Sequence, residues 1–151
     1  MNSNLDQFIA TIARLRAEDG CPWDREQTHR SLARYLLEET YEVMEAIHEG
    51  DANNLKEELG DLLLQIVLNA QVAKDAGQFN MEDIAESINS KMISRHPHVF
   101  GEKSLNSARQ VLAQWDELKD KEKALKKTQK KSSLDGIQRT LPALLQALKI
   151  S

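Results

Sequence analysis

Acidic side chains gather at two points of the sequence, at spacings that suit a helix. The first group is Glu38, Glu39 and Glu42, and the second is Glu58 and Asp61. Residues three or four apart share a helical face, so each group would place its carboxylates side by side. Such a face repels itself unless a cation neutralises it, and hard divalent metals prefer carboxylate oxygens as ligands. The spacing therefore predicts a metal site. Such a site would suit a metal-dependent enzyme that acts on a polyanion.

Neutralisation by basic side chains of the protein is the alternative for both groups. In the first group, Arg34 lies one turn before Glu38 and would serve that residue at best. Glu58 and Asp61 would need a lysine from another helix, because leucines flank them in the sequence. A carboxylate among leucines is normally exposed, paired or metal-bound, since desolvating a bare charge is costly. Both alternatives stay open at this point.

Helical periodicity predicts an all-α protein, most simply a four-helix bundle core with additional N- and C-terminal helices. Only three prolines and six glycines interrupt the 151 residues. Ser31 is a plausible N-cap, Gly50 a plausible stop, and Asn80 a plausible cap of a later helix. We expect one domain over residues 1–131 and a tail with a short helix over 132–151. The helices of the first domain are expected at about 3–17, 31–48, 54–76, 81–95 and 105–128.

The helices expected at 31–48 and 54–76 carry the two acidic groups. On the first of them, the glutamates border the apolar face. On the second, Glu58, Asp61 and Gln65 share one arc with leucines on either side. That helix is apolar nearly all round, as a central helix of a bundle should be. We therefore expect the five acids to converge on one shared pocket.

The charge and composition of the chain argue against several classes of protein. The net charge is −4, yet residues 119–131 carry seven lysines and two acids, so the remainder is strongly acidic. An acidic surface argues against long nucleic acid as a partner, and we expect the lysines to lie on a solvated helix end and linker. The single cysteine, Cys21, excludes an intramolecular disulfide framework. No signal peptide or span of ~20 apolar residues is evident, so we expect a soluble, cytoplasmic protein without a membrane partner.

Other candidate residues have an ordinary interpretation beside the functional one. Lys91 and Arg95 are an i, i+4 pair that is either a surface pair or a binder of nucleotide phosphates. Trp115, like Trp23, is more often a core residue than a platform for a base. Glu45 and His48 form a Glu-x-x-His pattern found in di-iron bundles, but no second copy of the pattern follows. A surface histidine is the simpler interpretation of His48.

The ordered set of motifs resembles the MazG-type all-α nucleoside triphosphate pyrophosphohydrolases over nearly the whole chain. A lone Glu-x-x-Glu is weak evidence, whereas five segments in this order are strong evidence. The matching segments are Gly20-Cys21-Pro22-Trp23-Asp24, Leu37-Glu38-Glu39-Thr40-Tyr41-Glu42, Glu58-Leu59-Gly60-Asp61-Leu62-Leu63, Arg95-His96-Pro97-His98-Val99-Phe100 and Leu141-Pro142-Ala143-Leu144.

The resemblance implies hydrolysis of a nucleoside triphosphate to the monophosphate and pyrophosphate, with Mg²⁺ or, alternatively, Mn²⁺ as cofactor. It also implies a homodimer or higher homo-oligomer. By position, the matching metal ligands are Glu39, Glu42, Glu58 and Asp61. Glu38 matches a further acid that would orient or deprotonate the attacking water. The positions that match nucleotide-binding residues are Lys91, Arg95 and Trp115.

Many proteins of this family carry two such domains in tandem, and this chain resembles the first of them. In tandem members the two domains need not be equally active. The alternative function is therefore a catalytically weak nucleotide-binding or oligomerisation domain of a two-domain protein. The sequence does not identify the base, the sugar or the number of metal ions.

Overall fold

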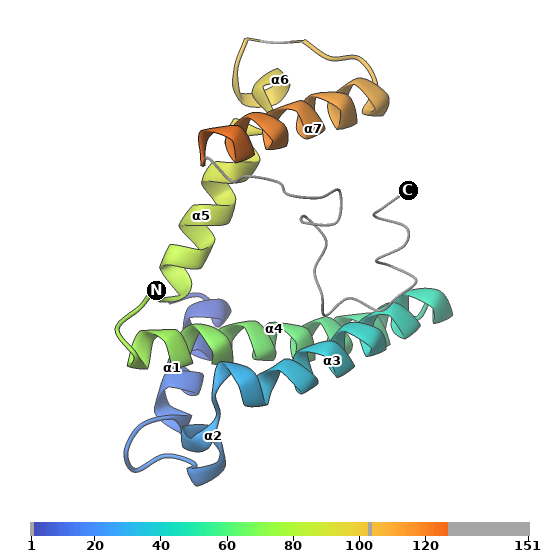
Figure 1. Cartoon of the computed structure of the whole chain (residues 1–151). Helices are drawn as coiled ribbons and strands as arrows, with labels where there is room; N and C mark the ends of the chain where they lie inside the picture. The colour runs from blue at the N-terminus through green and yellow to red at the C-terminus, as the bar shows by residue number, and fades with distance from the viewer. Residues whose placement is uncertain (1, 103, 127–151) are drawn as a thin grey trace. The chain divides into compact units, whose positions relative to one another are not determined.

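The structure is a computed structural model that describes residues 2–102 and 104–126 (Figure 1). No strand occurs in this part of the chain, and the all-α class is confirmed. The expected boundary at residue 131 and the helical tail over 132–151 lie outside the described residues and stay predictions. The helices are α1 (Asn4–Leu15), α2 (Pro22–Glu26), α3 (His29–Glu49), α4 (Ala52–Asp75), α5 (Met81–Ser94), α6 (Pro97–Phe100) and α7 (Ala108–Leu125).

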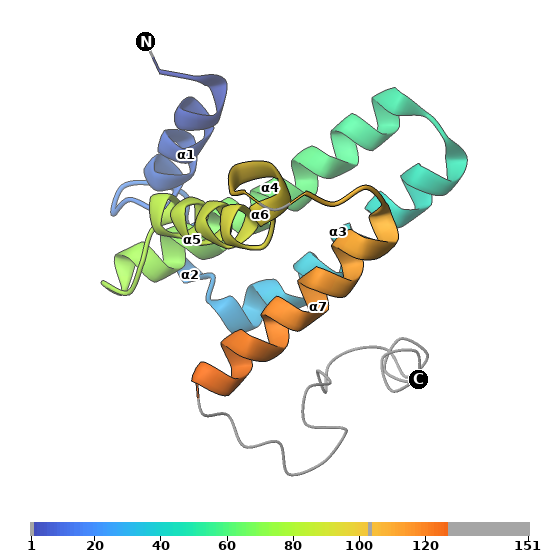
Figure 2. The same ribbon diagram turned by 90° about the horizontal axis from the view of Figure 1, so that it is seen from above.

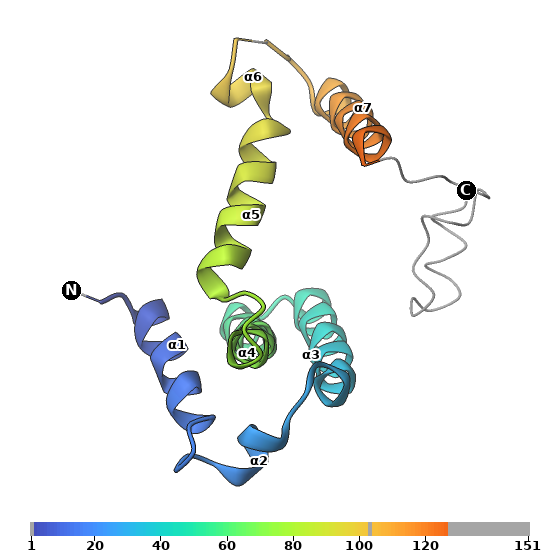
Figure 3. The ribbon, with the colours of Figure 1, turned by 60° about the vertical axis from the view of Figure 1, so that its left-hand side comes forward.

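The chain divides into two compact units, Met1–Ser90 and Lys91–Ser151, and the division falls within α5. In the first unit, α3 packs along α4 over most of its length, and α1 makes further contacts with α4. The tight turn that joins α3 to α4 is visible in Figure 2. Figure 3 looks nearly along α3 and α4, and it shows α1 on the opposite side of α4 from α3.

Local sequence explains where α3 and α4 begin and end. Gly50 ends α3 in the left-handed region, at φ 75°, which a residue without Cβ adopts at little cost. The Asp51 carboxylate then accepts hydrogen bonds from the backbone N–H groups of Asn53 and Asn54 and so caps α4. This short connection makes the two helices antiparallel neighbours, which is what brings the two acidic groups together.

The predicted N-cap of α3 was wrong. Thr28 is the N-cap, and Ser31 is the third residue of the helix and completes a capping box with it. Each hydroxyl accepts a hydrogen bond from the backbone N–H of the other residue. The N-cap therefore lies three residues before Ser31, and α3 begins at His29. In contrast, Asn80 does exchange side chain–backbone hydrogen bonds with Asp83 at the start of α5, as expected of a cap.

Two segments that were expected as turns or loops contain short helices instead. These are α2 and α6, and each has a proline in its first turn. Proline suits that position because its fixed φ is helical and its missing N–H would be unpaired there anyway. Helices of five and four residues are too short for apolar periodicity to reveal.

The core of the first unit forms where α1, α3 and α4 meet. Its buried residues are Ile12, Leu32, Val67 and Leu68. Arg16, at the end of α1, ties this region together by pairing with Asp75 at 2.9 Å and by donating hydrogen bonds to backbone oxygens of the α2 segment. Among the helices that the structure describes, none has the length and apolar character needed to span a membrane.

Candidate functional site

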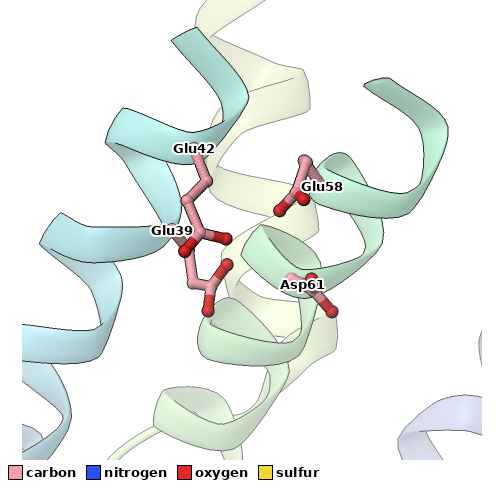
Figure 4. A group of neighbouring side chains, drawn as sticks. All are labelled: Glu39, Glu42, Glu58 and Asp61. Carbon is pink, nitrogen blue, oxygen red and sulfur yellow. The ribbon is translucent and has the colours of Figure 1, made fainter. Parts of the chain in front are cut away.

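Four carboxylates from α3 and α4 meet in the first unit. Glu39 and Glu42 lie one turn apart on α3, and Glu58 and Asp61 lie one turn apart on α4. Figure 4 shows Glu39, Glu42 and Glu58 turned toward the space between the two helices. One carboxylate oxygen from each residue lies within 4.8 Å of the others. We call these four residues the acidic cluster.

Three members of the acidic cluster are partly shielded from solvent, which strengthens the repulsion between their carboxylates. Glu39, Glu58 and Asp61 are partly buried, and Glu42 is exposed. One oxygen each of Glu39 and Glu58 is buried with no hydrogen-bond partner among the described residues. An unpaired buried oxygen of this kind costs free energy unless another group pairs with it.

The pKa values of two cluster members respond to this environment. A hydrogen bond with Glu42, then burial and repulsion by the neighbouring carboxylates, raise the pKa of Glu58 to about 7. Burial, followed by repulsion from Glu42 and Asp61, also raises the pKa of Glu39. Both shifts mean that the cluster disfavours its own full ionisation, which a bound cation would reverse.

No lysine, arginine or histidine within the described part of the chain forms an ion pair with any member of the acidic cluster. The cluster consists of oxygen donors alone and could hold a metal ion. Oxygen-only sites suit hard divalent cations such as Mg²⁺ and Mn²⁺. No histidine or cysteine of the described residues joins such a group, so the Glu45-x-x-His48 pattern gains no partner there.

Glu38 lies apart from the acidic cluster. Its side chain is exposed, and its Oε1 is 3.6 Å from the Nε of Arg34, one turn earlier on α3. Arg34 also lies over the ring of Tyr35, at 5.0 Å from the centroid. The alternative of neutralisation by Arg34 thus applies to Glu38 and to no member of the cluster.

The predicted nucleotide-binding residues all lie in the second unit. Arg95 is 9% exposed, and its guanidinium lies over the indole of Trp115, at 5.2 Å from the ring centroid. Lys91 is exposed and lies one turn before Arg95 on α5, where its carbonyl accepts the backbone N–H of Arg95. The structure therefore brings Arg95 and Trp115 into contact and places Lys91 on the neighbouring turn.

Sequence reasoning missed Glu122, the ionic partner of Arg95. Glu122 Oε2 accepts a hydrogen bond from Nη2 of Arg95 at 2.7 Å, and this bond holds the pKa of Glu122 below its ordinary value. The two residues are 27 positions apart on different helices, so no local pattern could have paired them. His96 was missed as well, and its ring packs edge-on against Trp115.

Comparisons with known proteins agree on one family. A family model described as the MazG nucleotide pyrophosphohydrolase domain matches residues 27–100. The chain is 47% identical over 149 residues to a nucleoside triphosphate pyrophosphohydrolase of Escherichia coli K12, a match that covers 98% of this chain and 56% of that protein. It is also 47% identical over 143 residues to the Bacillus subtilis protein named "Uncharacterized protein YabN", covering 95% of this chain and 29% of that one.

A solved structure supports the same grouping. The crystal structure of a mazG-related protein from Thermotoga maritima matches with a TM-score of 0.62 and 30% sequence identity. The match covers 76% of this chain and 98% of that one. In contrast, the chain spans only about a third to a half of the length of the two curated relatives.

Proposed function

The chain belongs to the MazG family, and we propose that it hydrolyses nucleoside triphosphates to nucleoside monophosphate and pyrophosphate with a divalent metal ion. The observation that carries this proposal is the acidic cluster, four carboxylates without a basic partner among the described residues. The name of the Escherichia coli relative, nucleoside triphosphate pyrophosphohydrolase, supports the reaction class. House-cleaning of nucleotide pools is the physiological role that such an activity would serve.

We propose Mg²⁺, with Mn²⁺ as the alternative, held by Glu39, Glu42, Glu58 and Asp61. The orphaned oxygens of Glu39 and Glu58 fit this assignment, since each needs a ligand that the described protein atoms do not supply. When bound, such an ion neutralises phosphate charge and lowers the pKa of a coordinated water. The carboxylates themselves fix the ion between α3 and α4 and lose the proton that Glu58 otherwise retains near neutral pH.

Glu38 is proposed as the acid that orients or deprotonates the attacking water. It adjoins the proposed ligand Glu39 in the sequence, and within the described part of the chain its ion pair is an exposed one with Arg34. Exposed pairs of this kind contribute little free energy, about 0–1 kcal/mol, so Arg34 would not prevent Glu38 from accepting a proton. Because the Glu38 side chain is exposed, its carboxylate is also accessible to solvent water.

Lys91, Arg95 and Trp115 are proposed to bind the nucleotide. The guanidinium of Arg95 and the exposed ammonium of Lys91 supply donors for phosphate oxygens, and the indole of Trp115 supplies a flat apolar face. Glu122 and Trp115 hold the guanidinium of Arg95 in one orientation, which lowers the entropy lost when it binds an anion.

A homodimer or higher homo-oligomer is proposed as the assembly. The supporting observation is a set of large apolar side chains that are exposed along α3 in the single chain. They are Leu36, Leu37, Tyr41, Met44 and Ile47. A contiguous apolar helix face on a soluble protein marks an interaction surface.

The test is product analysis with the purified chain, a panel of ribo- and deoxyribonucleoside triphosphates, and Mg²⁺. We expect monophosphate and pyrophosphate in equal amounts, and no turnover when EDTA removes the metal. Release of orthophosphate would contradict the proposed bond cleavage. Nucleotide binding without turnover would favour the alternative, a catalytically weak binding or oligomerisation domain.

A further inference from the structure

Gln65 on α4 has a buried amide oxygen without a hydrogen-bond partner among the described residues. Its side chain is 6% exposed, and its Oε1 is fully shielded from solvent. Native proteins rarely keep such an acceptor unpaired, because the lost hydration is not repaid. The Gln65 amide therefore requires a partner other than the described protein atoms.

The neighbours of Gln65 on either side show which face of α4 carries it. Asp61 of the acidic cluster is one turn earlier on the same face of α4. One turn later, Asn69 Oδ1 lies 2.8 Å from Nδ1 of His29, the first residue of α3. The acidic cluster and the Asn69–His29 contact each join a residue of α4 to a residue of α3. Gln65 lies between them along α4, on the same face of the helix as Asp61 and Asn69.

The surroundings of Gln65 exclude bulk water, and Asp61 of the acidic cluster lies one turn away on the same face of α4. Leu32 and Leu68, both fully buried, belong to the core next to this turn of α4. A fifth carboxylate at position 65 would add to the repulsion within the cluster. An amide instead offers a hydrogen-bond acceptor without a further negative charge.

We propose that Gln65 is a positioning residue of the metal centre, and that its Oε1 accepts a hydrogen bond from a water of the bound ion's hydration shell. This inference rests on the proposed function, because the acidic cluster must hold a metal ion for that water to exist. Residues that contact a metal ion through such outer hydrogen bonds typically change its affinity by about 10–100-fold.

The experiment is a titration of the full chain with Mn²⁺ alone, in which electron paramagnetic resonance measures the free ion. We expect Gln65→Met, which keeps length and shape but lacks the amide acceptor, to bind Mn²⁺ about 10-fold more weakly. Thermal unfolding of the metal-free variant should occur at the same or a higher temperature, because an unpaired acceptor is gone. Gln65→Glu keeps an acceptor oxygen and adds a negative charge that attracts the ion, so it should bind Mn²⁺ at least as tightly as the wild type does.

Asn69→Leu is the matched control, one turn along the same face. It loses the contact with His29 and the hydrogen bond that Asn69 Nδ2 donates to the backbone carbonyl of Gln65, so it should unfold at a lower temperature and bind Mn²⁺ normally. Unchanged Mn²⁺ affinity in Gln65→Met would overturn the proposal while leaving the metal centre intact. Should Gln65→Met not fold, weakened binding by Gln65→Glu would overturn it instead. Absence of Mn²⁺ binding by the wild type would overturn the metal centre and this inference together.

Discussion

Among the members of the acidic cluster, Glu58 has a pKa that is raised to about 7 by its neighbours. Its pKa of about 7, raised first by the hydrogen bond with Glu42, leaves it partly protonated at neutral pH. The protonated carboxyl is the form that the metal-free fold favours. A metal ion would favour the ionised form, so proton loss and metal binding are linked at this residue.

The stability of the metal-free protein should therefore depend on pH through Glu58. Because its folded pKa lies above the ordinary value of 4.5, Glu58 stabilises the fold below that value and loses this contribution as the pH rises toward 7. We expect the free energy of unfolding in EDTA to fall between about pH 5 and pH 8 relative to that of Glu58→Gln, which cannot ionise. Urea unfolding of both proteins measures the difference, and a difference that does not vary with pH would contradict the shift.

Conservative substitution of a proposed metal ligand should lower activity far more than it lowers stability. Glu42→Gln and Asp61→Asn each remove a charge but keep the shape of the side chain. Since outer-shell changes alone cost about 10–100-fold in affinity or activity, we expect each ligand variant to lose at least about 100-fold in kcat/KM. Thermal unfolding of the metal-free variants should stay at or above that of the wild type, because repulsion is relieved.

Glu45→Gln is the control for the ligand variants, since Glu45 is an exposed acid of α3 outside the cluster. It should keep wild-type activity. Equal activity losses in Glu45→Gln and Asp61→Asn would show that net charge, not metal ligation, determines the rate.

Sequence spacing predicted which acids share a face, but it could not separate Glu38 from its neighbours. Helical geometry placed Glu39 and Glu42 one turn apart, and the cluster follows from that placement. Glu38 and Glu39 are adjacent, and only the packing of α3 on α4 determines which of the two turns inward. The metal and catalytic roles of these residues stay predictions.

At the scale of helices, the caps were the most informative local signals. Apolar periodicity together with Gly50 and Asn80 placed the ends of α3, α4 and α5 to within about two residues. The N-cap of α3 was misplaced because Ser31 and Thr28 are both good capping residues, and only the reciprocal hydrogen bonds of the capping box distinguish them. The short helices α2 and α6 had no periodicity to detect.

The connection between α3 and α4 is a testable element because it sets the register of the acidic cluster. Gly50 has φ 75°, where an L side chain is strained, so Gly50→Ala should lower the free energy of unfolding by about 1 kcal/mol. Gly60 is the matched control, since it lies within α4 and an added Cβ would meet nothing within 4 Å. Gly60→Ala should instead raise the free energy of unfolding by up to about 1 kcal/mol.

Urea unfolding of the two glycine variants gives both values. A stabilising Gly50→Ala would mean that the left-handed turn does not exist. A destabilising Gly60→Ala would mean that another surface, such as a second copy of the chain, packs against α4 at Gly60.

At the scale of the molecule, the proposed functional residues divide between two units. The acidic cluster lies in the first unit, and Lys91, Arg95 and Trp115 lie in the second. The family match over residues 27–100 includes the cluster, Lys91 and Arg95, and it ends before Trp115. The sequence predicted the all-α class, but not the division within α5, because the periodicity of that helix continues through the division.

Self-association is expected of the whole chain because the apolar face of α3 is exposed. Met44 and Ile47 are 53% and 61% exposed in the single chain. Replacing both with lysine should prevent association, since burying two unpaired ammonium groups is costly. Light scattering coupled to gel filtration should report a dimer or larger assembly for the wild type and a monomer for the double variant. Gln78→Lys, an added charge at an exposed site after α4, should leave the wild-type mass unchanged.

The location of a bound ion tests the central proposal most directly. Crystals of the full chain grown with Mn²⁺ would reveal the ion by its anomalous scattering. We predict a peak between α3 and α4, coordinated by oxygens of Glu39, Glu42, Glu58 and Asp61, that is absent from crystals of Asp61→Asn. Wild-type crystals that bind Mn²⁺ elsewhere, or show these four carboxylates without an ion at saturating Mn²⁺, would contradict the proposed metal centre.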